Sequence, residues 1–379
     1  MTAPAPRQPD AATAAPAAGT PRVLFACGGT GGHVYPAIAI ADAVRALRPG
    51  AAVAFAGTRD RMEWEAVPKA GYPIHAITVS GFQRGLSAAA LTRNLAFPFK
   101  LAKGLAESWS LVGAFDPDVV VGTGGYASGP VGLAGALRGR KLVVQEQNAV
   151  AGATNRLLAG RADRVFVAFD DARDAFSRPT VVAGNPVRQD LQGADRAQAL
   201  AHFGFPDDAR VLLAFGGSLG ARPINDAVAG ALDAVLAVPN AHVVWAAGKR
   251  YYDALSARVD HPRVRLLPYL DRMDLAYAAA DLAVCRAGAI TCSELAVTGT
   301  PSILIPSPNV TADHQTENAR ALGDAAVVLP ETDLGRFPSA VAGLLADDAQ
   351  LLDMQEVALS HARPDAAHTI AQAVLDLAS

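Results

Sequence analysis

Val23-Leu24-Phe25-Ala26-Cys27-Gly28-Gly29-Thr30-Gly31-Gly32-His33-Val34-Tyr35-Pro36-Ala37 is the stretch that decides the fold. A short apolar run leads into four glycines around one threonine, and an apolar helical pattern follows. Glycine allows positive φ and close approach of a ligand, and the next helix offers free N–H groups and a positive dipole end. The stretch therefore predicts a strand, a turn and a helix N-terminus that suits a diphosphate. His33 places an imidazole beside it. A turn that only reverses the chain is the alternative.

The same alternation of β-rich runs and helical stretches continues in two series. The first series of expected strands comprises Arg22–Cys27, Ala52–Gly57, Ile74–Val79, Asp118–Gly122, Lys141–Gln147, Arg164–Ala168 and Val181–Ala183. The second begins at Arg210, passes a further glycine turn at Gly216–Gly220, and continues with His242–Ala246, Arg263–Leu267, Leu282–Cys285, Ser302–Pro306 and Ala325–Leu329. Runs that are short and apolar on both faces are typical of buried parallel strands. The pattern predicts an α/β fold of two doubly wound, Rossmann-like parallel-sheet domains facing a cleft, with ligands at the C-terminal strand ends.

The composition narrows the class of protein. A chain of 379 residues, 51% hydrophobic and 18% charged, favours two soluble domains with large cores. A formal net charge of −3 gives no reason to expect nucleic-acid binding. The cysteines Cys27, Cys285 and Cys292 form no Cys-x-x-Cys pair and no cluster with histidine. We therefore expect no disulfide and no metal site, and thiols buried in a protein of the reducing cytoplasm.

Two segments need a separate interpretation. Residues 1–20 are rich in Ala, Pro and Thr and lack the apolar core of a signal peptide, which predicts a disordered extension. Residues 119–137 carry no charge and are nearly long enough to cross a bilayer. Their glycines, and Pro130 near the middle, favour a strand, a glycine loop and a helix instead.

The glycine loop Gly122-Thr-Gly-Gly-Tyr-Ala127 supports a different function. It follows an expected strand, precedes an expected helix and fits the dinucleotide pattern G-x-G-x-x-G/A. Glu146 ends the next expected strand, where a ribose ligand would lie. Taken alone, this loop predicts an NAD-dependent oxidoreductase. The pattern is short, however, and leaves the turns at 28–32 and 216–220 without a role, so this function is the minor alternative.

Two further motifs place carboxylates near strand ends. Asp116-Pro-Asp118 imitates the Asp-x-Asp metal signature of some glycosyltransferases, but it precedes its strand, so we interpret it as a loop and cap pair. Arg286-Ala-Gly-Ala-Ile-Thr-Cys-Ser-Glu294 follows a strand and opens a helix near Ala289. The start of that helix suits a phosphate, and Glu294, about one turn in, suits a pair of ribose hydroxyls. An ordinary capping carboxylate is the alternative.

Neutral amides open a later helix at Asp313-His-Gln-Thr-Glu-Asn-Ala319. Gln315 and Asn318 both donate and accept hydrogen bonds, as the hydroxyl groups of a sugar require. A solvated helix start explains the same residues equally well.

A basic and apolar stretch lies in the first half of the chain. Residues 66–106 contain no acidic side chain. Their cations are Lys69, Arg84, Arg93, Lys100 and Lys103, interleaved with Phe82, Leu86, Leu91, Leu95, Phe97, Phe99, Leu101 and Leu105, with Trp109 just beyond. Such a patch favours an anionic membrane surface, although the apolar side chains can equally face the core. Pro98 breaks the helical period and argues against one long amphipathic helix.

Seven motifs together carry a family resemblance from about residue 22 onward. They are Gly28-Gly-Thr-Gly-Gly-His-Val-Tyr-Pro36, Gly124-Gly-Tyr-Ala-Ser-Gly-Pro130, Glu146-Gln-Asn148, Gly184-Asn-Pro-Val-Arg188, Gly216-Gly-Ser-Leu-Gly-Ala221, Arg286–Glu294 and His314-Gln-Thr-Glu-Asn-Ala319. In this order and spacing the chain resembles the MurG family of peptidoglycan glycosyltransferases, which add N-acetylglucosamine (GlcNAc) to a lipid-linked muramyl-peptide precursor. The resemblance implies a GT-B fold and an inverting, metal-independent hexosyltransferase without a cofactor.

The resemblance also implies domain limits. Residues 21–188 would form an N-terminal domain on the acceptor and membrane side, and residues 189–364 would form the domain that binds the UDP-sugar. A C-terminal helix at about 365–379 would pack back on the first domain.

Site residues follow from the same resemblance. Thr30, Gly31 and Gly32 would face the sugar and diphosphate of UDP-GlcNAc, with His33 as the favoured general base. The other donor contacts would be Asn148 and Gln315 at the sugar, Arg188 and the backbone around Leu270 at the uracil, Ser218 at a phosphate, and Ala289, Ile290, Thr291, Cys292, Ser293 and Glu294 at phosphate and ribose. The acceptor side would hold Gly124, Gly125, Tyr126 and Glu146.

The implied reaction moves GlcNAc to the C4 hydroxyl of undecaprenyl-pyrophosphoryl-MurNAc-pentapeptide (lipid I), which gives lipid II for cell-wall synthesis. The enzyme would be a peripheral protein at the cytoplasmic face of the cell membrane, held there by residues 82–109. A role in cell shape and division, with cell-wall synthesis or divisome proteins as partners, would follow. A related GT-B glycosyltransferase with another lipid acceptor is the main alternative.

One residue departs from the family pattern. Many relatives have histidine before the Glu-Gln-Asn run, where this chain has Gln145. If that histidine serves catalysis elsewhere, its role here is vacant or is filled by another group.

Overall fold

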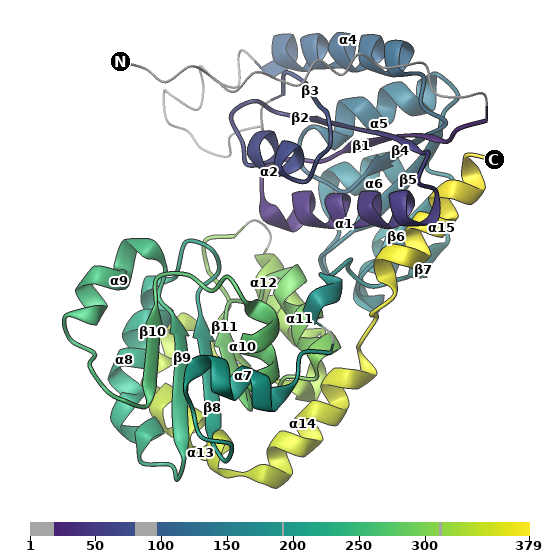
Figure 1. The fold of residues 1–379 in the computed structure, drawn as a ribbon. Coiled ribbons are helices and arrows are strands. Elements are labelled where there is room, and N and C mark those ends of the chain that lie inside the picture. The colour runs from purple at the N-terminus through teal and green to yellow at the C-terminus, as the bar shows by residue number, and fades with distance from the viewer. Residues whose placement is uncertain (1–18, 80–96, 192, 311–312) are drawn as a thin grey trace. The chain divides into compact units, whose positions relative to one another are not determined.

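Figure 1 shows the chain as a computed structural model. The structure describes residues 19–79, 97–191, 193–310 and 313–379. The expected N-terminal extension up to residue 18, and residues 82–96 of the basic and apolar stretch, lie outside the described residues.

In the described part of the chain, the first sheet has the strand order β3-β2-β1-β4-β5-β6-β7. The strands are β1 (Arg22–Ala26), β2 (Ala52–Gly57), β3 (Ile74–Ala76), β4 (Val119–Gly122), β5 (Lys141–Glu146), β6 (Arg164–Val167) and β7 (Thr180–Val182). β1 pairs in parallel with both β2 and β4, and β4 pairs in parallel with β5. Every strand of the first predicted series is confirmed, although β3 ends at Ala76 instead of Val79.

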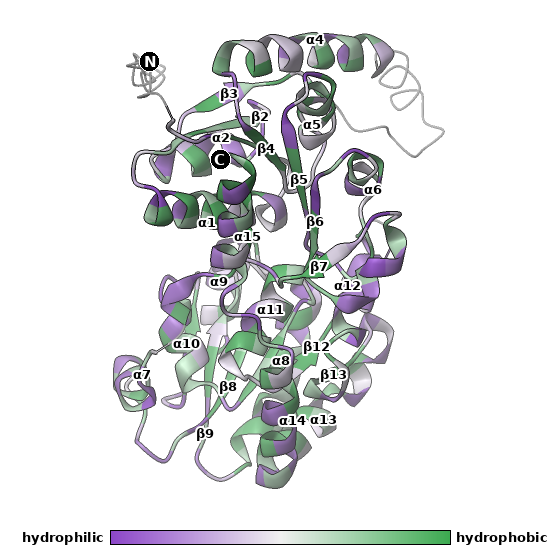
Figure 2. Cartoon of the chain, turned by 90° about the vertical axis from the view of Figure 1, so that its right-hand side faces the viewer, coloured by the Kyte–Doolittle hydropathy of each residue, from purple (hydrophilic) through white to green (hydrophobic). Residues whose placement is uncertain are grey.

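Helices cover both faces of this sheet, as a doubly wound fold requires. α1 (Gly31–Leu47) and α2 (Glu63–Lys69) lie on one side, and α4 (Phe97–Phe115), α5 (Ser128–Leu137) and α6 (Ala153–Ala159) lie on the other (Figures 1 and 2). α15 (Ala366–Leu377) lies on the side of α1 in both views (Figures 1 and 2), and the 3-10 helix η1 (Asp170–Ala175) follows β6. Residues 119–137 form β4, a glycine loop and α5, as predicted.

Pro98 is the second residue of α4 as the structure describes that helix. In the first turn of a helix, proline is tolerated because the N–H group it lacks would have no helical partner. The helix then runs unbroken to Phe115. Among the helices that the structure describes, none combines the length and the apolar character needed to span a bilayer.

The second sheet has the described strand order β10-β9-β8-β11-β12-β13, and its neighbouring strands pair in parallel. Its strands are β8 (Arg210–Phe215), β9 (Ala241–Ala246), β10 (Val264–Leu267), β11 (Leu282–Cys285), β12 (Ser302–Leu304) and β13 (Ala326–Val328). Its α-helices are α7 (Arg196–Phe203), α8 (Arg222–Leu236), α9 (Lys249–Ser256), α10 (Met273–Ala279), α11 (Ala289–Thr298), α12 (His314–Arg320), α13 (Phe337–Ala346) and α14 (Asp348–Ser360). Short 3-10 helices are η2 (Gln189–Leu191), η4 (Gly323–Ala325) and η5 (Glu331–Arg336). The second predicted series is thus confirmed as well.

The second sheet separates two hydrophobic cores. Along β8, Val211 and Leu213 belong to the core beneath α7, α10 and α11, whereas Leu212 and Ala214 belong to the core beneath α8 and α13. This alternation follows from the period of two in a strand. Because both faces of β8, β9 and β11 are largely buried, these strands are mostly apolar, and much of their length appears green in Figure 2.

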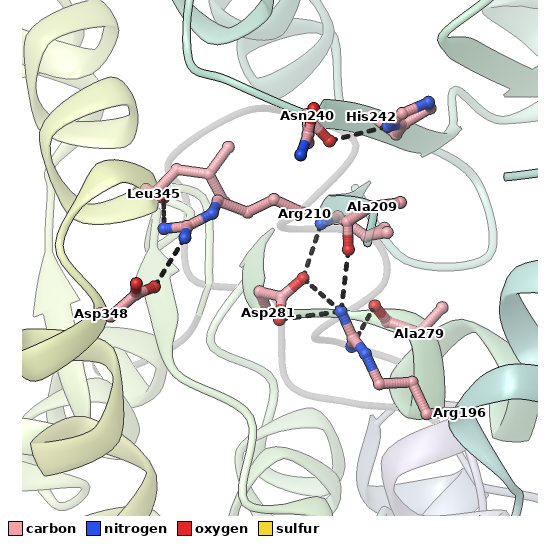
Figure 3. A network of polar contacts seen from close by, with 10 residues as sticks. Arg196, Ala209, Arg210, Asn240, His242, Ala279, Asp281, Leu345 and Asp348 are labelled. Carbon is pink, nitrogen blue, oxygen red and sulfur yellow. Dashed lines mark hydrogen bonds and ion pairs between the residues drawn. The ribbon is translucent and has the colours of Figure 1, made fainter. Parts of the chain in front are cut away.

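At the N-terminal ends of the strands, each sheet has an aspartate that directly precedes one strand and binds the backbone of a neighbouring strand of the same sheet. Asp118 accepts from the N–H of Arg22 at 2.8 Å, and Asp281 accepts from the N–H of Val211 at 2.7 Å. Arg196 also binds both carboxylate oxygens of Asp281, at 3.0 and 2.8 Å (Figure 3). Asp118 therefore acts as a cap, in agreement with that part of the interpretation of Asp116-Pro-Asp118.

Packing divides the chain into two compact units, which we describe separately. The first unit comprises residues up to 145, residues 153–165 and residues 368–379. The second unit comprises residues 146–152 and 166–367.

Candidate functional site

The first glycine turn joins β1 to α1 at the C-terminal end of its strand. Gly29 takes a φ of +94°, which glycine adopts without strain. Thr30 precedes α1 in an extended conformation and makes no side-chain cap. Its carbonyl accepts from the N–H groups of His33 at 3.0 Å and Val34 at 3.2 Å. The first N–H groups of a helix lack a helical acceptor, so the start of α1 suits an anion.

His33 lies in the first turn of α1 and is partly exposed. Its ring lies against the loop after β4, because a Cβ on Gly124 would be only 2.7 Å from His33 Nδ1. Thr123 Oγ1 donates to His33 O at 2.8 Å and ties the same loop to the helix. Tyr126, in that loop, is 59% exposed. The first unit therefore brings His33 next to Gly124, one of the residues expected on the acceptor side, whereas Glu146 belongs to the second unit.

The two glycine turns of the first unit touch through their backbones. A Cβ on Gly125, which has a φ of +80°, would lie 2.1 Å from Gly28 O. Ser128 Oγ accepts from the N–H of Gly124 at 3.1 Å and lies 2.6 Å from Ala26 O. Glycine at position 125 is therefore required by space as well as by conformation, and the turns hold each other in place.

The second unit uses the same kind of contact after β8. A Cβ on Gly220, which has a φ of +72°, would lie 2.1 Å from Ala247 O. Gly248, in the loop after β9, has a φ of +89°, and its Cβ would lie 2.6 Å from Leu219 O. Ser218 is exposed on the turn that these backbone contacts fix. Its hydroxyl is thus presented next to free backbone at the C-terminal end of the sheet.

α11 adds a second helix N-terminus to this unit. It follows Gly288, which makes no side-chain cap. Asn185 Nδ2 lies 3.2 Å from Ala289 O and 3.0 Å from Ser293 Oγ, and so braces the first turn. Cys292 turns into the core: it is fully buried and donates its N–H to Gly288 O at 2.9 Å, and burial raises the pKa of its thiol to about 12. Of the stretch 289–294, Ile290, Thr291, Ser293 and Glu294 are partly exposed.

Glu294 has an electrostatic environment set by three neighbours. Tyr277 Oη donates to Glu294 Oε2 at 3.0 Å. Desolvation raises the pKa of Glu294 to about 7, against the hydrogen bond from Tyr277 and the charge of Arg188, which both lower it, while Asp190 raises it further. The carboxyl group therefore changes its charge near neutral pH.

Two arginine–aspartate pairs lie on the same side of this unit. Arg188 binds Asp190 through Nε at 3.0 Å and Nη2 at 2.8 Å, and both side chains are exposed. Arg272 binds Asp274 in the same bidentate way, at 2.9 and 2.6 Å. Leu270 is only 6% exposed, so its side chain belongs to the core and its backbone is the part that can meet a ligand.

Glu146 holds its own loop together. The buried carboxylate accepts from the N–H groups of Asn148 at 2.9 Å and Gly152 at 2.8 Å, and from Asn148 Nδ2 at 3.2 Å. A dinucleotide-dependent enzyme would need this carboxylate for a ribose. Its use inside the loop counts against the oxidoreductase alternative.

Asn318 links this loop to α12. It is 1% exposed, its Oδ1 accepts from the N–H of Ala149 at 2.8 Å, and its Nδ2 lies 3.2 Å from both Asn148 Oδ1 and Ala287 O. The solvated helix start considered from the sequence is therefore wrong for Asn318, because packing and not solvent satisfies its amide. Gln315 is partly exposed, and its Oε1 accepts from the N–H of Ser307 at 2.8 Å.

The site residues thus fall into two groups. The first unit holds Thr30, Gly31, Gly32, His33, Gly124, Gly125 and Tyr126. The second unit holds Glu146, Asn148, Arg188, Ser218, Leu270, the stretch 289–294 and Gln315. Among the described residues, no group of three or more His, Cys, Asp or Glu side chains could hold a metal ion.

Sequence reasoning missed three supporting residues: Asn185, Tyr277, and Glu63, whose carboxylate accepts from the N–H of Gly29 at 3.1 Å. A tyrosine in an apolar helix is typical of core, and only its hydroxyl contact with Glu294 distinguishes Tyr277. Asn185 stands in a motif that carries the resemblance, which was the one available signal. Glu63 had no signal in the sequence.

Comparison with known proteins assigns both halves of the chain to one family. Residues 23–167 match the glycosyltransferase family 28 N-terminal domain, and residues 211–370 match the glycosyltransferase family 28 C-terminal domain.

Individual relatives agree. A UDP-N-acetylglucosamine–N-acetylmuramyl-(pentapeptide) pyrophosphoryl-undecaprenol N-acetylglucosamine transferase of Salinibacter ruber is 57% identical over 94% of this chain and 97% of its own. A transferase of the same name from Chlorobium limicola is 42% identical over 94% and 99%. The crystal structure of MurG from Acinetobacter baumannii matches with a TM-score of 0.77 and 31% identity, over 94% of this chain and 99% of that one.

Proposed function

Because this chain belongs to the MurG family of family 28 glycosyltransferases, we propose that it transfers GlcNAc from UDP-GlcNAc to the C4 hydroxyl of lipid I and so forms lipid II. The observation that carries the proposal is the 57% identity, over 94% of the chain, to a transferase named for this reaction. The site geometry supports it, since each unit presents a glycine turn and an uncapped helix N-terminus at its strand ends.

We assign His33 as the general base. The acceptor oxygen forms a bond to the anomeric carbon of GlcNAc while the bond from that carbon to the diphosphate oxygen breaks, so the configuration inverts to a β-1,4 link. The proton of the acceptor hydroxyl passes to the His33 ring. The ring is partly exposed and lies beside Gly124, Gly125 and Tyr126, which we assign to the acceptor side.

The departing UDP carries the electron pair of the broken bond on its diphosphate. Ser218 and the first N–H groups of α11 are the donors that we assign to that charge, together with the turn at Thr30, Gly31 and Gly32. Preorganised donors of this kind replace a metal ion in stabilising the leaving group.

We assign the binding of the ribose, the uracil and the sugar hydroxyls of UDP-GlcNAc to residues of the second unit. We assign the ribose hydroxyls to Glu294, the uracil to Arg188 and the backbone at Leu270, and the sugar hydroxyls to Asn148 and Gln315. Glu146, which the family resemblance assigns to the acceptor side, also holds Asn148 in place, because its carboxylate accepts hydrogen bonds from the Asn148 N–H and Nδ2.

Helix α4 supports attachment to the cytoplasmic face of the membrane. Gly104, Ser108 and Val112 turn inward at helical spacing, and a Cβ on Gly104 would lie 2.3 Å from Thr78 O. Phe99 is 80% and Trp109 45% exposed. Lys100 and Lys103 are exposed on the same helix. Exposed aromatic rings with cations favour an anionic lipid surface, and a place in cell-wall synthesis and division remains a prediction from the family resemblance.

The test is release of UDP from UDP-GlcNAc by the purified chain, with and without a short-chain lipid I analogue. We expect acceptor-dependent release together with the β-1,4-linked disaccharide. Donor binding with no transfer would mean another acceptor. Failure to bind UDP-GlcNAc at all would overturn the proposal.

A further inference from the structure

Glu63, the first residue of α2, carries a carboxylate in the interior of the first unit. The residue is 0% exposed. Its Oε2 accepts from the N–H of Gly29 at 3.1 Å, and its Oε1 accepts from the N–H and the hydroxyl of Thr58 at 3.0 and 2.6 Å. Glu63 thus reaches from a neighbouring helix to the turn that precedes His33.

The surrounding backbone leaves space for this side chain. A Cβ on Gly28 would lie 2.8 Å from Glu63 Oε1, and a Cβ on Gly57 would lie 2.7 Å from Glu63 Cγ. Glycine therefore occurs at the ends of both β1 and β2 where the carboxylate passes. The side chain and the turn fit each other closely, so neither can move alone.

The charge of Glu63 is not neutralised by an ion pair with Lys, Arg or His among the described residues. Its partners are instead the N–H groups of Gly29 and Thr58 and the Thr58 hydroxyl. An apolar residue at position 63 would leave these three donors without this acceptor. The carboxylate is therefore the group that holds the Gly29 N–H.

The Gly28–Gly29 part of the turn is in contact with protein groups on two sides. Glu63 binds the Gly29 N–H on one side, and Gly125 lies against Gly28 O on the other. Thr30 O then accepts from the N–H of His33 at 3.0 Å, so the fixed turn sets where the first turn of α1 begins. The Gly28–Gly29 peptide and the helix turn that carries His33 are thus linked through Thr30.

We propose that Glu63 is a positioning residue for the transfer reaction, which holds the Gly28–Thr30 turn so that His33 and the first N–H groups of α1 keep their reactive geometry. This inference rests on the proposed function of His33. It assigns Glu63 no contact with either substrate.

Glu63→Gln is the main test, because it keeps the shape and removes one acceptor. The amide must direct an N–H toward either Gly29 or Thr58, where a donor already points. We expect kcat per folded molecule to fall about 10- to 100-fold while KM for UDP-GlcNAc stays within about 3-fold, because the donor is held mainly by the second unit. The NMR signals of the Gly29 amide and the His33 ring should move.

Tyr72→Phe is the matched control. Tyr72 is 3% exposed and donates to Asp42 on α1 at 2.6 Å, so its loss also removes a hydrogen bond to a carboxylate in the first unit. It should lower the melting temperature without changing kcat per folded molecule or the His33 signals. If Glu63→Gln does not fold, Thr58→Val replaces it as the test, because it removes only the hydroxyl donor to Glu63. The same kcat and NMR measurements apply, and the expected loss of kcat is smaller.

Unchanged kcat and unchanged His33 signals in the folded variants would overturn the role of Glu63. That outcome is distinct from failure of the proposed function, which would appear as no acceptor-dependent UDP release by the unaltered chain. The NMR comparison reports on the turn in either case.

Discussion

At the scale of single residues, His33 carries the largest expected effect. Replacement by alanine removes the group that we assign to the acceptor proton, and loss of a general base typically lowers turnover by about 10²- to 10⁴-fold. UDP-GlcNAc affinity should stay close to that of the unaltered chain, as measured by calorimetry. Near-normal turnover with donor bound would exclude His33 as the base.

Gly124 tests the position of that imidazole. In Gly124→Ala the new Cβ would lie 2.7 Å from His33 Nδ1, so the ring must move, and turnover should fall about 10-fold or more. Gly139→Ala is the control, because Gly139 also has a positive φ, +73°, but its Cβ would meet nothing within 4 Å. Equal losses in the two variants would show that backbone strain, and not displacement of His33, is responsible.

Glu294 predicts a pH dependence of stability. Its pKa of about 7 in the folded chain lies above the ordinary value of 4.5, so the folded state favours the protonated form. That stabilisation is complete below about pH 4.5 and is lost as the pH rises through 7. The side chain of Glu294→Gln does not titrate, so the variant should not lose this stabilisation as the pH rises. The free energy of unfolding of the variant minus that of the unaltered chain should therefore increase by about 1 to 3 kcal/mol from pH 5 to pH 8.

Urea unfolding at the two pH values measures this difference, and UDP binding by the same variant should be weak. Glu356→Gln, at an exposed position of α14, is the control that should show no such gain. A Glu294→Gln effect of equal size at pH 5 and pH 8 would contradict the raised pKa.

At the scale of elements, α4 gives a prediction about lipid binding. Phe99→Ser removes an aromatic ring that is 80% exposed, so binding to vesicles of anionic lipid should weaken several-fold while activity on a soluble acceptor analogue is kept. Leu352→Ser, at a position 64% exposed on α14, is the matched change elsewhere on the surface. Sedimentation with vesicles compares them, and equal binding by both variants would remove α4 from the membrane contact.

The strands and glycine turns were the features that the sequence predicted best. The central strands were the easiest to recognise, because burial on both faces makes them apolar throughout, as in Val119–Gly122 and Leu282–Cys285. The glycine turns were recognisable because positive φ restricts the residue type. Helix α4 was harder to predict, because a proline such as Pro98 can mark either a break in a helix or its first turn.

Contacts between helices, strands and loops could not be predicted from the sequence. Asn318 meets Asn148 and Ala149 across about 170 residues of chain, and an amide at a helix start gives no sign of such a partner. Glu63 likewise resembled an ordinary residue in the first turn of a helix. Such contacts depend on three-dimensional packing, which one sequence without an alignment does not encode in any local pattern.

At the scale of the whole molecule, the first unit depends on a distant segment. α15 buries Ile370, Ala371, Val374 and Leu375, and residues 368–379 belong to the first unit. Deletion of 368–379 should therefore destabilise the first unit by several kcal/mol, at roughly 1.5 to 3 kcal/mol for each large apolar side chain. Hydrogen exchange should quicken in β1, β2 and β4 and stay slow in β8, β9 and β11. Uniform quickening in both sheets would contradict this division.

The discontinuous first unit also has a consequence for synthesis on the ribosome. Residues 368–379 are translated after the entire second unit, which ends at residue 367. At about 5 to 20 residues per second, the second sheet can close while the first still waits for α15. Nascent chains should therefore acquire protease resistance in the order opposite to that of translation, with the half that emerges first maturing last.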